Sequence, residues 1–348
     1  MTAGRVRPAL FYSVAAPLLL VALVTGVVVG STYLEWSVVL RVLMSRLMPD
    51  SWLGAAPTSP PEDAIVWLIR LPRVLVAGVV GAGLATAGAM MQSLFRNPLA
   101  EPSLTGVGPG AVLGAVIVFV TGWGAASVVA LPLASIVSAL LALTLVYAIA
   151  TRGGSTPITS LLLTGIAVGA LLTAASSLLI SLNIVTWQVA QEIVFWMMGG
   201  LDSRTWAHVW ISAPFVLVGF CAAFLQSRTL DLLLLGEETA QSLGVDIESA
   251  KRLVVVTAAL LTGASVAVAG LVGFVGLVVP HAVRLLLGPG HRTLLPASAV
   301  AGAAFVMLCD LAARTVRPPA EVRLGVVTAL CGAPLFLFLL MRRLREQA

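Results

Sequence analysis

Histidine, cysteine and serine side chains could supply a nucleophile, a general base or a metal ligand in this sequence. The histidines and cysteines are far apart along the chain, and none has the spacing of a metal site or a hydrolytic motif. Residues 106–110 superficially resemble a phosphate-binding loop, but Pro109 interrupts them and no Lys-Ser or Lys-Thr pair follows. We therefore predict no catalytic residue, no metal site and no cofactor bound by this chain. The histidines and cysteines are His208, His281, His291, Cys221, Cys309 and Cys331.

The longest polar stretch, residues 226–252, has the pattern of a surface that binds a partner. Between Leu235 and Gly244, apolar and polar positions are arranged as in a short amphipathic helix, and glycine is a favoured residue just past a helix end. Such a helix could insert into a groove on a soluble partner. A solvated loop between two helices is the alternative that the pattern leaves open.

Arginines gather beside three apolar runs, in a way that could form a second binding surface. A single arginine at the end of an apolar helix is explained by its charged head reaching for water. Five together could form a basic rim that holds carboxylates of a docking protein through charge-assisted hydrogen bonds. Acidic residues nearby in the sequence could instead neutralise some of them within the chain. The arginines are Arg70, Arg73, Arg314, Arg317 and Arg323, and the acidic residues are Glu62, Asp63, Asp310 and Glu321.

The elements that must position these residues are membrane-spanning helices. Of 348 residues, 59% are hydrophobic and 10% are charged, and the mean hydropathy is +1.05, whereas a soluble domain carries about 25% charged residues. A hydrocarbon layer of about 30 Å takes roughly 20 apolar residues of helix. The chain therefore has room for about ten spans and little else, which excludes a separate soluble catalytic domain. We predict an all-α integral membrane protein in which residues 1–348 form one domain.

Ten apolar runs separated by polar or Pro/Gly-containing breaks mark the expected spans, and the eighth is short for a full crossing. With ten crossings and a cytoplasmic N-terminus, twelve of the twenty basic residues lie inside, as the positive-inside rule favours. Dropping the eighth crossing would place Arg342, Arg343 and Arg345 outside. Both termini are therefore expected in the cytoplasm, and because the basic residues act as orientation signals, no nucleic-acid partner is expected. The runs are residues 9–31, 74–92, 105–122, 127–150, 159–183, 208–226, 253–272, 275–287, 294–313 and 324–341.

The interiors of most spans contain no ionisable residue. Asp310 and His281 are the nearest exceptions, and both lie toward the ends of their runs. Because acids and histidines inside membrane spans usually mark proton or ion pathways, their scarcity argues against a proton-coupled carrier. Small residues instead line one face of the second run, which indicates close helix packing.

Several blocks in order along about 270 residues resemble the signature of the FecCD family of ABC importer permeases, which serve iron-siderophores, haem and cobalamin. The first is Arg70-Leu71-Pro72-Arg73. One departure concerns residues 321–325, where Arg323 stands in place of the proline usual in the family. A backbone restraint is lost there and a positive charge gained, so this loop is less certain to dock as its relatives do. The other blocks are residues 91–102, 196–200, 235–244, 273–281, 291–296 and 325–334.

This resemblance implies a type II ABC importer permease fold. Two copies of the chain would enclose a central pathway in the inner or plasma membrane, surrounded by lipid. Two ATPase subunits, which bind ATP and magnesium, would lie below them, and a periplasmic or lipid-anchored substrate-binding protein above. The chain itself would not be an enzyme.

The resemblance also assigns residues to three surfaces. Arg70, Arg73 and Arg314 would dock the binding protein. The cytoplasmic gate would lie near Asn97 and Leu99, with Thr159 and Ser160 at the start of the fifth span, which would line the pathway. The residues expected to couple to the ATPase are Leu235, Gly236, Glu237, Glu238, Ala240, Leu243 and Gly244.

We expect transport by alternating access without covalent chemistry. The expected cargo is a metal chelate, with a ferric siderophore ranked first, haem second and cobalamin third, although residues 196–200 also resemble cobalamin permeases. The alternative is a secondary transporter driven by an ion gradient.

Overall fold

The computed structural model describes residues 7–30, 34–47, 59–183, 187–318 and 320–347. Within these ranges the chain is helical and has no strand. Among the described residues, seven helices are long and apolar enough to cross a membrane, and three shorter apolar helices accompany them. They correspond one to one with the ten predicted runs, so this prediction is confirmed. Arg5, which was counted as an orientation signal, lies outside the described residues.

The ten helices share high apolar content and are separated by short turns or small connecting helices. The spanning helices are α1 (Pro8–Val28), α5 (Leu71–Leu94), α6 (Val107–Thr121), α8 (Ala130–Ala150), α9 (Ile158–Asn183), α11 (Trp206–Leu225), α14 (Ile247–Ala269), α15 (Val275–Leu287), α16 (His291–Thr315) and α17 (Leu324–Gln347). The connecting helices are α2 (Trp36–Leu47), α4 (Pro60–Asp63), η1 (Ala64–Arg70), η2 (Pro102–Thr105), α7 (Trp123–Ala126), α10 (Trp187–Met197), α12 (Ser227–Leu234) and α13 (Glu237–Ser242).

The second span begins well before residue 74, the predicted start. Helices α4, η1 and α5 follow one another without a break from Pro60 to Leu94. Segment η1 is a π-helix, and its last turn is closed by a bond from the Leu71 amide to the Val66 carbonyl. Because Pro72 has no amide hydrogen, a wider turn before it lets the helix continue where a sequence pattern suggests a break.

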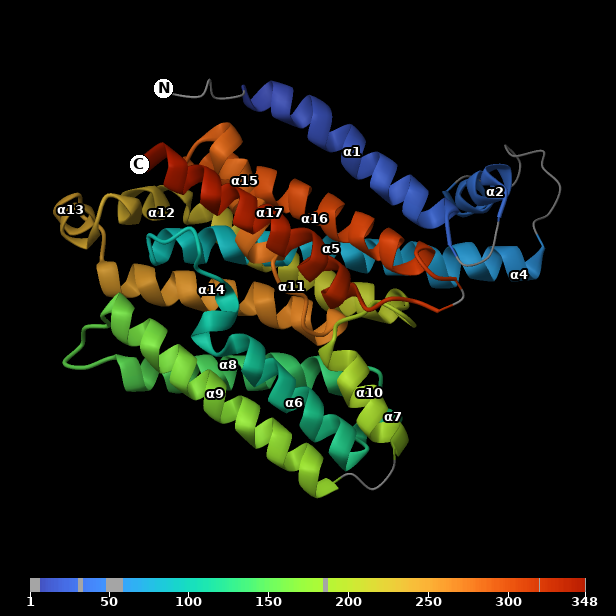
Figure 1. The fold of residues 1–348 in the computed structure, drawn as a ribbon, viewed down its shortest axis with the longest axis horizontal. Coiled ribbons are helices and arrows are strands. Elements are labelled where there is room, and N and C mark those ends of the chain that lie inside the picture. The colour runs from blue at the N-terminus through green and yellow to red at the C-terminus, as the bar shows by residue number, and fades with distance from the viewer. Residues whose placement is uncertain (1–6, 31–33, 48–58, 184–186, 319, 348) are drawn as a thin grey trace.

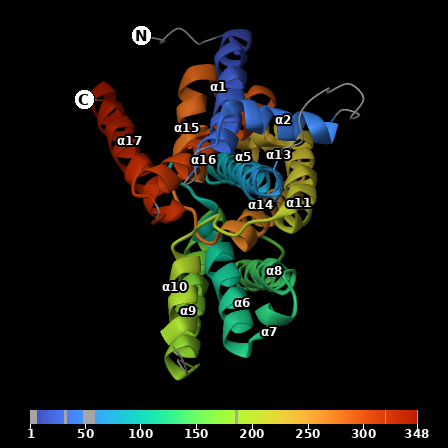
Figure 2. The same ribbon diagram turned by 90° about the vertical axis from the view of Figure 1, so that its right-hand side faces the viewer.

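Helix α5 lies at the centre of the molecule, in contact with α11, α14, α15 and α16 (Figures 1 and 2). Helices α6, α8 and α9 pack together on one side, and α14 joins them to the α5 group. The start of α1 and the end of α17 lie at the same end of the bundle as α13, whereas α2, α4 and α10 lie at the opposite end (Figure 1). We refer to these as the α13 end and the α4 end. Because ten is an even number of crossings, the first and last spanning helices must have their outer ends on the same side of the membrane, as they do here.

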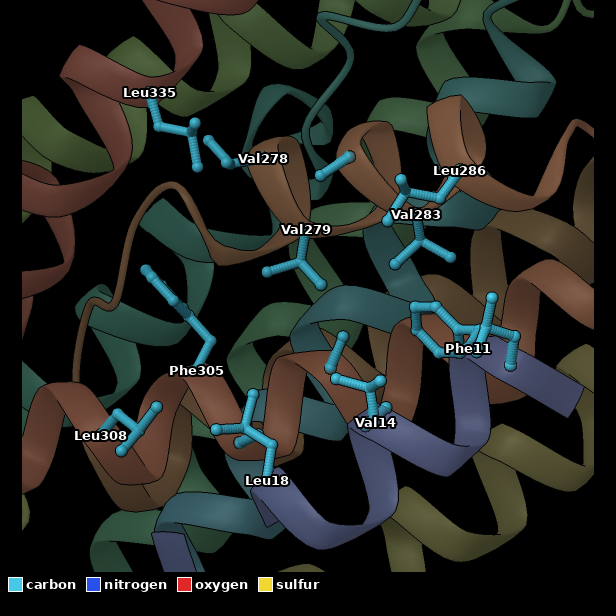
Figure 3. A pocket seen from close by; sticks show the side chains of 15 residues that line it. Phe11, Val14, Leu18, Val278, Val279, Val283, Leu286, Phe305, Leu308 and Leu335 are labelled. Atoms are coloured by element: carbon cyan, nitrogen blue, oxygen red, sulfur yellow. The ribbon is translucent and has the colours of Figure 1, made fainter. Parts of the chain in front are cut away.

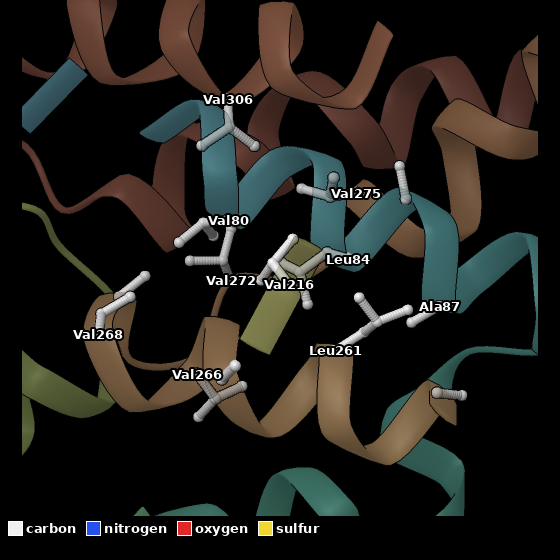
Figure 4. Close-up of a cluster of buried hydrophobic side chains, with 14 of the residues drawn as sticks. Val80, Leu84, Ala87, Val216, Leu261, Val266, Val268, Val272, Val275 and Val306 are labelled. Atoms are coloured by element: carbon white, nitrogen blue, oxygen red, sulfur yellow. The ribbon is translucent and has the colours of Figure 1, made fainter. Parts of the chain in front are cut away.

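Small residues allow the backbones around α5 to touch. A Cβ atom added to Gly81 would lie 2.1 Å from the carbonyl oxygen of Gly302, and one added to Gly88 would lie 1.8 Å from that of Gly276. In hydrocarbon, apolar side chains gain nothing by preferring each other to lipid, so such close backbone contacts supply much of the packing. Larger side chains, among them Val80 and Leu261, fill the space between these contacts (Figure 4).

The eighth span is short because part of its crossing is not helical. Helix α15 has 13 residues, or about 20 Å of helix, and an irregular segment from Gly270 to Phe274 precedes it. Three segments where helices are interrupted meet here and are joined by backbone hydrogen bonds. The Gly200 amide donates to the Ala269 carbonyl. The amides of Leu324 and Gly325 donate to the carbonyls of Gly199 and Met198, respectively. We call residues 198–200, 269–271 and 324–325 the backbone junction. Irregular backbone inside a membrane is tolerated where such bonds satisfy it.

An apolar groove of about 490 Å³ runs between α1, α15, α16 and α17 (Figure 3). Its lining includes Leu10, Phe11, Val283 and Phe305, and none of its lining residues is polar. The groove therefore offers a hydrocarbon environment and no group that could take part in chemistry.

Gly88 should be the more sensitive of two buried glycines on neighbouring helices. We expect Gly88→Ala to lower the free energy of unfolding by about 1–3 kcal/mol, because the new methyl group overlaps the Gly276 carbonyl. Gly263→Ala is the control, since its new Cβ would meet Ala139 at an ordinary 3.4 Å. Thermal unfolding in detergent micelles measures both, and equal stability of the two variants would contradict the packing described.

Candidate functional site

The polar segment at the α13 end folds as two short helices. Helix α12 ends at Leu234 and α13 begins at Glu237, with Gly236 between them at a φ of 111°. After α13, the Gly244 amide donates to Gln241 and the Val245 amide to Ala240. These two bonds form a Schellman motif, and Gly244 takes the left-handed position that the motif requires, with a φ of 86°. The predicted amphipathic helix ending near Gly244 is therefore present.

The two faces of α13 differ as expected for a surface that meets a partner. Leu235 and Leu243, which flank the helix, are 63% and 58% exposed, and Glu238 is also exposed. Ala240 is fully buried, so of the predicted coupling residues it anchors the helix and does not contribute to its outer surface. An exposed apolar pair beside an acidic residue, at an end of the bundle rather than along its lipid-facing side, fits a protein contact.

Lys251 holds α13 against the bundle from the inside. Its side chain on α14 is 1% exposed, and Nζ lies 2.7 Å from Glu237 Oε2 and 3.2 Å from Glu248 Oε1. It also donates to the backbone carbonyl of Thr156 at 2.9 Å. In the sequence, Lys251 was one of the twelve basic residues placed on the inner side, with no other role predicted. Its spacing of three residues from Glu248 was visible, but its contacts with Glu237 and Thr156 depend on the fold.

A second polar chain connects α12 to the core. Asp231 Oδ1 accepts hydrogen bonds from the backbone amide and Nδ1 of His291, at 2.9 and 2.6 Å. His291 Nε2 lies 2.5 Å from Ser93 Oγ, and Arg284 donates to the same oxygen. The order Asp-His-Ser resembles a hydrolytic triad, but Ser93 and His291 are fully buried and Ser93 Oγ donates to the Ala89 carbonyl. The chain instead fixes the start of α16 to α12.

The predicted gate residues lie in two exposed turns. Asn97 and Leu99 follow the end of α5, where Asn97 Oδ1 accepts the Leu99 amide at 2.9 Å. Thr159 and Ser160 lie in the first turn of α9. Helix α5 ends and α9 begins toward the α13 end (Figure 1), although within the described ranges no hydrogen bond joins the two pairs. Between them in sequence, Glu101 is half-buried, and burial raises its pKa.

The three arginines predicted to form an exposed rim lie inside the protein. Arg70, Arg73 and Arg314 are only 4%, 8% and 3% exposed. Arg73 forms ion pairs with Asp310 at 2.9 Å and Glu321 at 2.8 Å. The prediction of an exposed rim is therefore wrong for these three, and the alternative of neutralisation within the chain is confirmed for Arg73.

The other two buried arginines close the end of α1. Arg70 Nη1 donates to the carbonyls of Val27 and Val28, and Arg314 Nη2 donates to that of Gly26. Arg314 Nε also lies 3.2 Å from Asp310. The last carbonyls of a helix have no partner within it, and cations there interact well with the helix dipole. These arginines therefore fasten α1 to η1 and α16.

The remaining two arginines of the set differ in exposure. Arg317 is exposed. Arg323, which stands where the family usually has proline, pairs with Asp202 at 2.9 Å and lies over the ring of Phe195. Burial works to raise the pKa of Asp202, but the Arg323 charge and hydrogen bonds outweigh it and hold that pKa below its usual value.

Together these features define a class of protein: a multi-pass membrane protein with a pair of short, partly exposed helices at one end. Among the described residues there is no cluster of three or more histidine, cysteine, aspartate or glutamate side chains that could hold a metal ion.

Comparisons with known proteins agree with this class. The FecCD transport family matches residues 18–342. The chain is 45% identical over 285 residues to the cobalamin import system permease protein BtuC of Halobacterium salinarum, covering 81% of this chain and 75% of that protein. It is 36% identical over 347 residues to the hemin transport system permease protein HmuU of Yersinia pestis, covering 99% and 98%. A solved structure described as an inward-facing metal-chelate type ABC transporter matches 97% of this chain and 100% of its own, with 30% identity and a TM-score of 0.83.

The chain belongs to the FecCD transport family. It is a membrane-spanning permease of the ABC transporter type with the type II importer fold, as the resemblance in its sequence implied.

Arg73 should matter far more to stability than Arg323. Replacing Arg73 by Met leaves Asp310, which is 1% exposed, without its closest partner, and we expect a loss of about 3–5 kcal/mol. Arg323→Met breaks a pair whose acid is half exposed, so a loss of about 0–1 kcal/mol is expected. Unfolding of the two purified variants in detergent tests this, and comparable losses would show that the buried cluster is not special.

Proposed function

We propose that two copies of this chain form the membrane part of an ATP-driven importer for a metal chelate. The observation that carries the proposal is the α12–α13 pair, with Leu235, Glu238 and Leu243 exposed for a soluble partner and the helix anchored inside by Lys251. Membership of a transport family whose relatives are named ABC permeases supports an ATPase as that partner. Leu235, Glu238, Leu243 and Gly244 would form the contact, while Gly236 and Ala240 shape it.

The α13 end is proposed to face the cytoplasm. The start of α1 and the end of α17 share that end (Figure 1), so both termini would be cytoplasmic. Arg7, Arg152, Arg228, Arg252 and Arg292 are exposed on helix ends and turns that we assign to this side, which accords with the positive-inside rule.

The α4 end would then receive the substrate-binding protein. With Arg70, Arg73 and Arg314 buried, their proposed role in docking becomes indirect: they hold the ends of α1, α5 and α16 in place. Arg317 is the exposed arginine of the set and is the better candidate for direct contact.

Helix α9 is proposed to line the pathway between the two copies. Only 22% of its most apolar stretch is buried by the rest of the chain, compared with 83% for the span from Pro60 to Leu94. Thr159 and Ser160 at its start, with Asn97 and Leu99, would form the inner gate. A second copy and the passing cargo would cover the remainder of this helix.

The mechanism we propose is alternating access. ATP and the loaded binding protein would each favour one orientation of the cavity, because a ligand shifts such an equilibrium only by its differential affinity for the two states. Among the described residues, the side chains that form ion pairs lie near the ends of the bundle, as with Arg73 and Lys251. This arrangement supports an energy source outside the chain.

We place cobalamin first among the cargoes and haem second, ahead of a ferric siderophore. Proteins named for cobalamin import are 45% and 39% identical to this chain, and one named for hemin transport is 36% identical over nearly its whole length. Both cargoes are metal complexes of a large macrocycle. A wide pathway lined by apolar and small residues suits either, so the binding protein would set most of the specificity.

Reconstitution tests the cargo and the energy source together. The chain, its partner ATPase and its binding protein are placed in proteoliposomes with radiolabelled cyanocobalamin, haemin or a ferric hydroxamate siderophore. We expect ATP-dependent, vanadate-sensitive accumulation, greatest for cyanocobalamin. Accumulation without the ATPase that an ionophore abolishes would instead establish a secondary transporter.

The exposed leucines of the α13 segment should bind the ATPase. Because loss of a central anchor costs about 2 kcal/mol or more at a protein interface, we expect Leu243→Asp to weaken ATPase co-purification by about tenfold or more. Val316→Asp is the matched control, an exposed apolar residue at the α4 end. Co-purification that is unchanged by Leu243→Asp, or reduced equally by both substitutions, would contradict the assignment.

A further inference from the structure

The buried ammonium group of Lys251 contacts three separate parts of the chain. Glu237 comes from α13, Glu248 from the first turn of α14, and the Thr156 carbonyl from the turn between α8 and α9. Nζ donates hydrogen bonds to Glu248 Oε1 at 3.2 Å and to the Thr156 carbonyl at 2.9 Å, and it forms an ion pair with Glu237 Oε2 at 2.7 Å. The ammonium group therefore has two hydrogen-bond acceptors and two carboxylate partners, one of which, Glu248, is both.

Burial makes this arrangement demanding. A charge removed from water is tolerated only when it is paired and hydrogen-bonded, so each lost partner would leave an uncompensated group inside the protein. Glu237 is the one partner that lies on α13, the helix of the proposed ATPase contact, and its side chain is 35% exposed. Helix α13 is therefore held by a buried ammonium group that has almost no contact with water.

The other side of the site leads directly into α9. The Thr156 amide donates to Glu248 Oε2 at 3.1 Å, while its carbonyl accepts from Lys251. Thr156 is thus held at both of its backbone polar groups, and its hydroxyl lies 2.8 Å from that of Thr151 at the end of α8. Helix α9 begins two residues later at Ile158, and Thr159 and Ser160 follow.

We propose that Lys251 is a positioning residue that transmits displacement of α13 to the start of α9 through Glu237 on one side and Thr156 on the other. This inference rests on the proposed role of α13 as the ATPase contact. It gives a specific path for coupling: a shift of α13 pulls Glu237, the ammonium group follows its closest carboxylate, and the turn that starts α9 moves with it. Lys251 touches neither ATP nor cargo.

A reporter at the start of α9 tests this path without a cargo. Thr159→Cys is introduced in a chain from which Cys221, Cys309 and Cys331 have been removed. The chain is assembled with its ATPase in lipid nanodiscs. The labelling rate of the new cysteine by a maleimide dye is measured with and without ATP and vanadate, alongside ATP hydrolysis. The chain that carries only these cysteine changes, called the background, should show an ATP-dependent change in labelling rate.

Breaking either side of the ammonium site should remove that change while hydrolysis continues. For Lys251→Met we expect the ATP-dependent difference in labelling rate to shrink by roughly fivefold or more. Fivefold is about the smallest effect that a typical coupling free energy between two sites produces. Glu237→Gln should act in the same direction and serves if Lys251→Met fails to assemble, because Glu237 is partly exposed. Arg292→Met, a neighbouring exposed cation at the same end, is the control that should behave as the background.

Combination of the two substitutions separates coupling from simple destabilisation. Lys251→Met with Glu237→Gln should reduce the labelling change no further than Lys251→Met alone, because residues in one contact are not additive. A labelling change retained in both single variants overturns the proposal, as does a fully additive double variant. An unmodified chain that never associates with an ATPase would overturn the proposed function itself, a result distinct from these.

Discussion

A hydrocarbon layer offers no hydrogen-bonding partner to a carbonyl oxygen, an amide or a charged side chain, and this constraint explains most of the unusual features of the chain. The last carbonyls of α1 are bound by Arg70 and Arg314. The segments of the backbone junction are hydrogen-bonded to one another. At the α13 end, buried Lys251 binds the Thr156 carbonyl and two carboxylates, and buried His291 is hydrogen-bonded to Asp231. These polar groups therefore join separate segments of the bundle.

The same constraint shapes the apolar packing. Because lipid competes equally for apolar side chains, the centre of the molecule is built from surfaces with little or no side chain, as where Gly81 meets Gly302 and Gly88 meets Gly276. Helix α5 thus becomes the common support of α11, α14, α15 and α16. Helix α5 also connects the two ends of the bundle, with Arg73 near one end and Ser93 near the other. The polar contacts at both ends therefore involve side chains of the same helix.

Local patterns predicted the spans and the α13 helix well, because hydropathy and the position of Gly244 are properties of adjacent residues. The second span was placed too late, since Leu71-Pro72 reads as a break until the π-helical turn before it is known. The arginines were misplaced for a different reason. Arg73 and Asp310 are 237 residues apart in the sequence, and no periodicity links them. Lys251 and His291 gain their partners in the same way, from segments that only the fold brings together.

The buried arginine cluster also affects how the α4 end would look to an approaching protein. Arg73 and Arg314 lie with Asp310 and Glu321, so the formal charges of these four side chains cancel. A group of charges with no net charge produces little electrostatic potential beyond a few ångströms, and mobile salt ions screen what remains. Exposed charges at this end, such as Arg317, should then contribute more to long-range electrostatic steering, and so to the diffusional encounter rate, than these four side chains do.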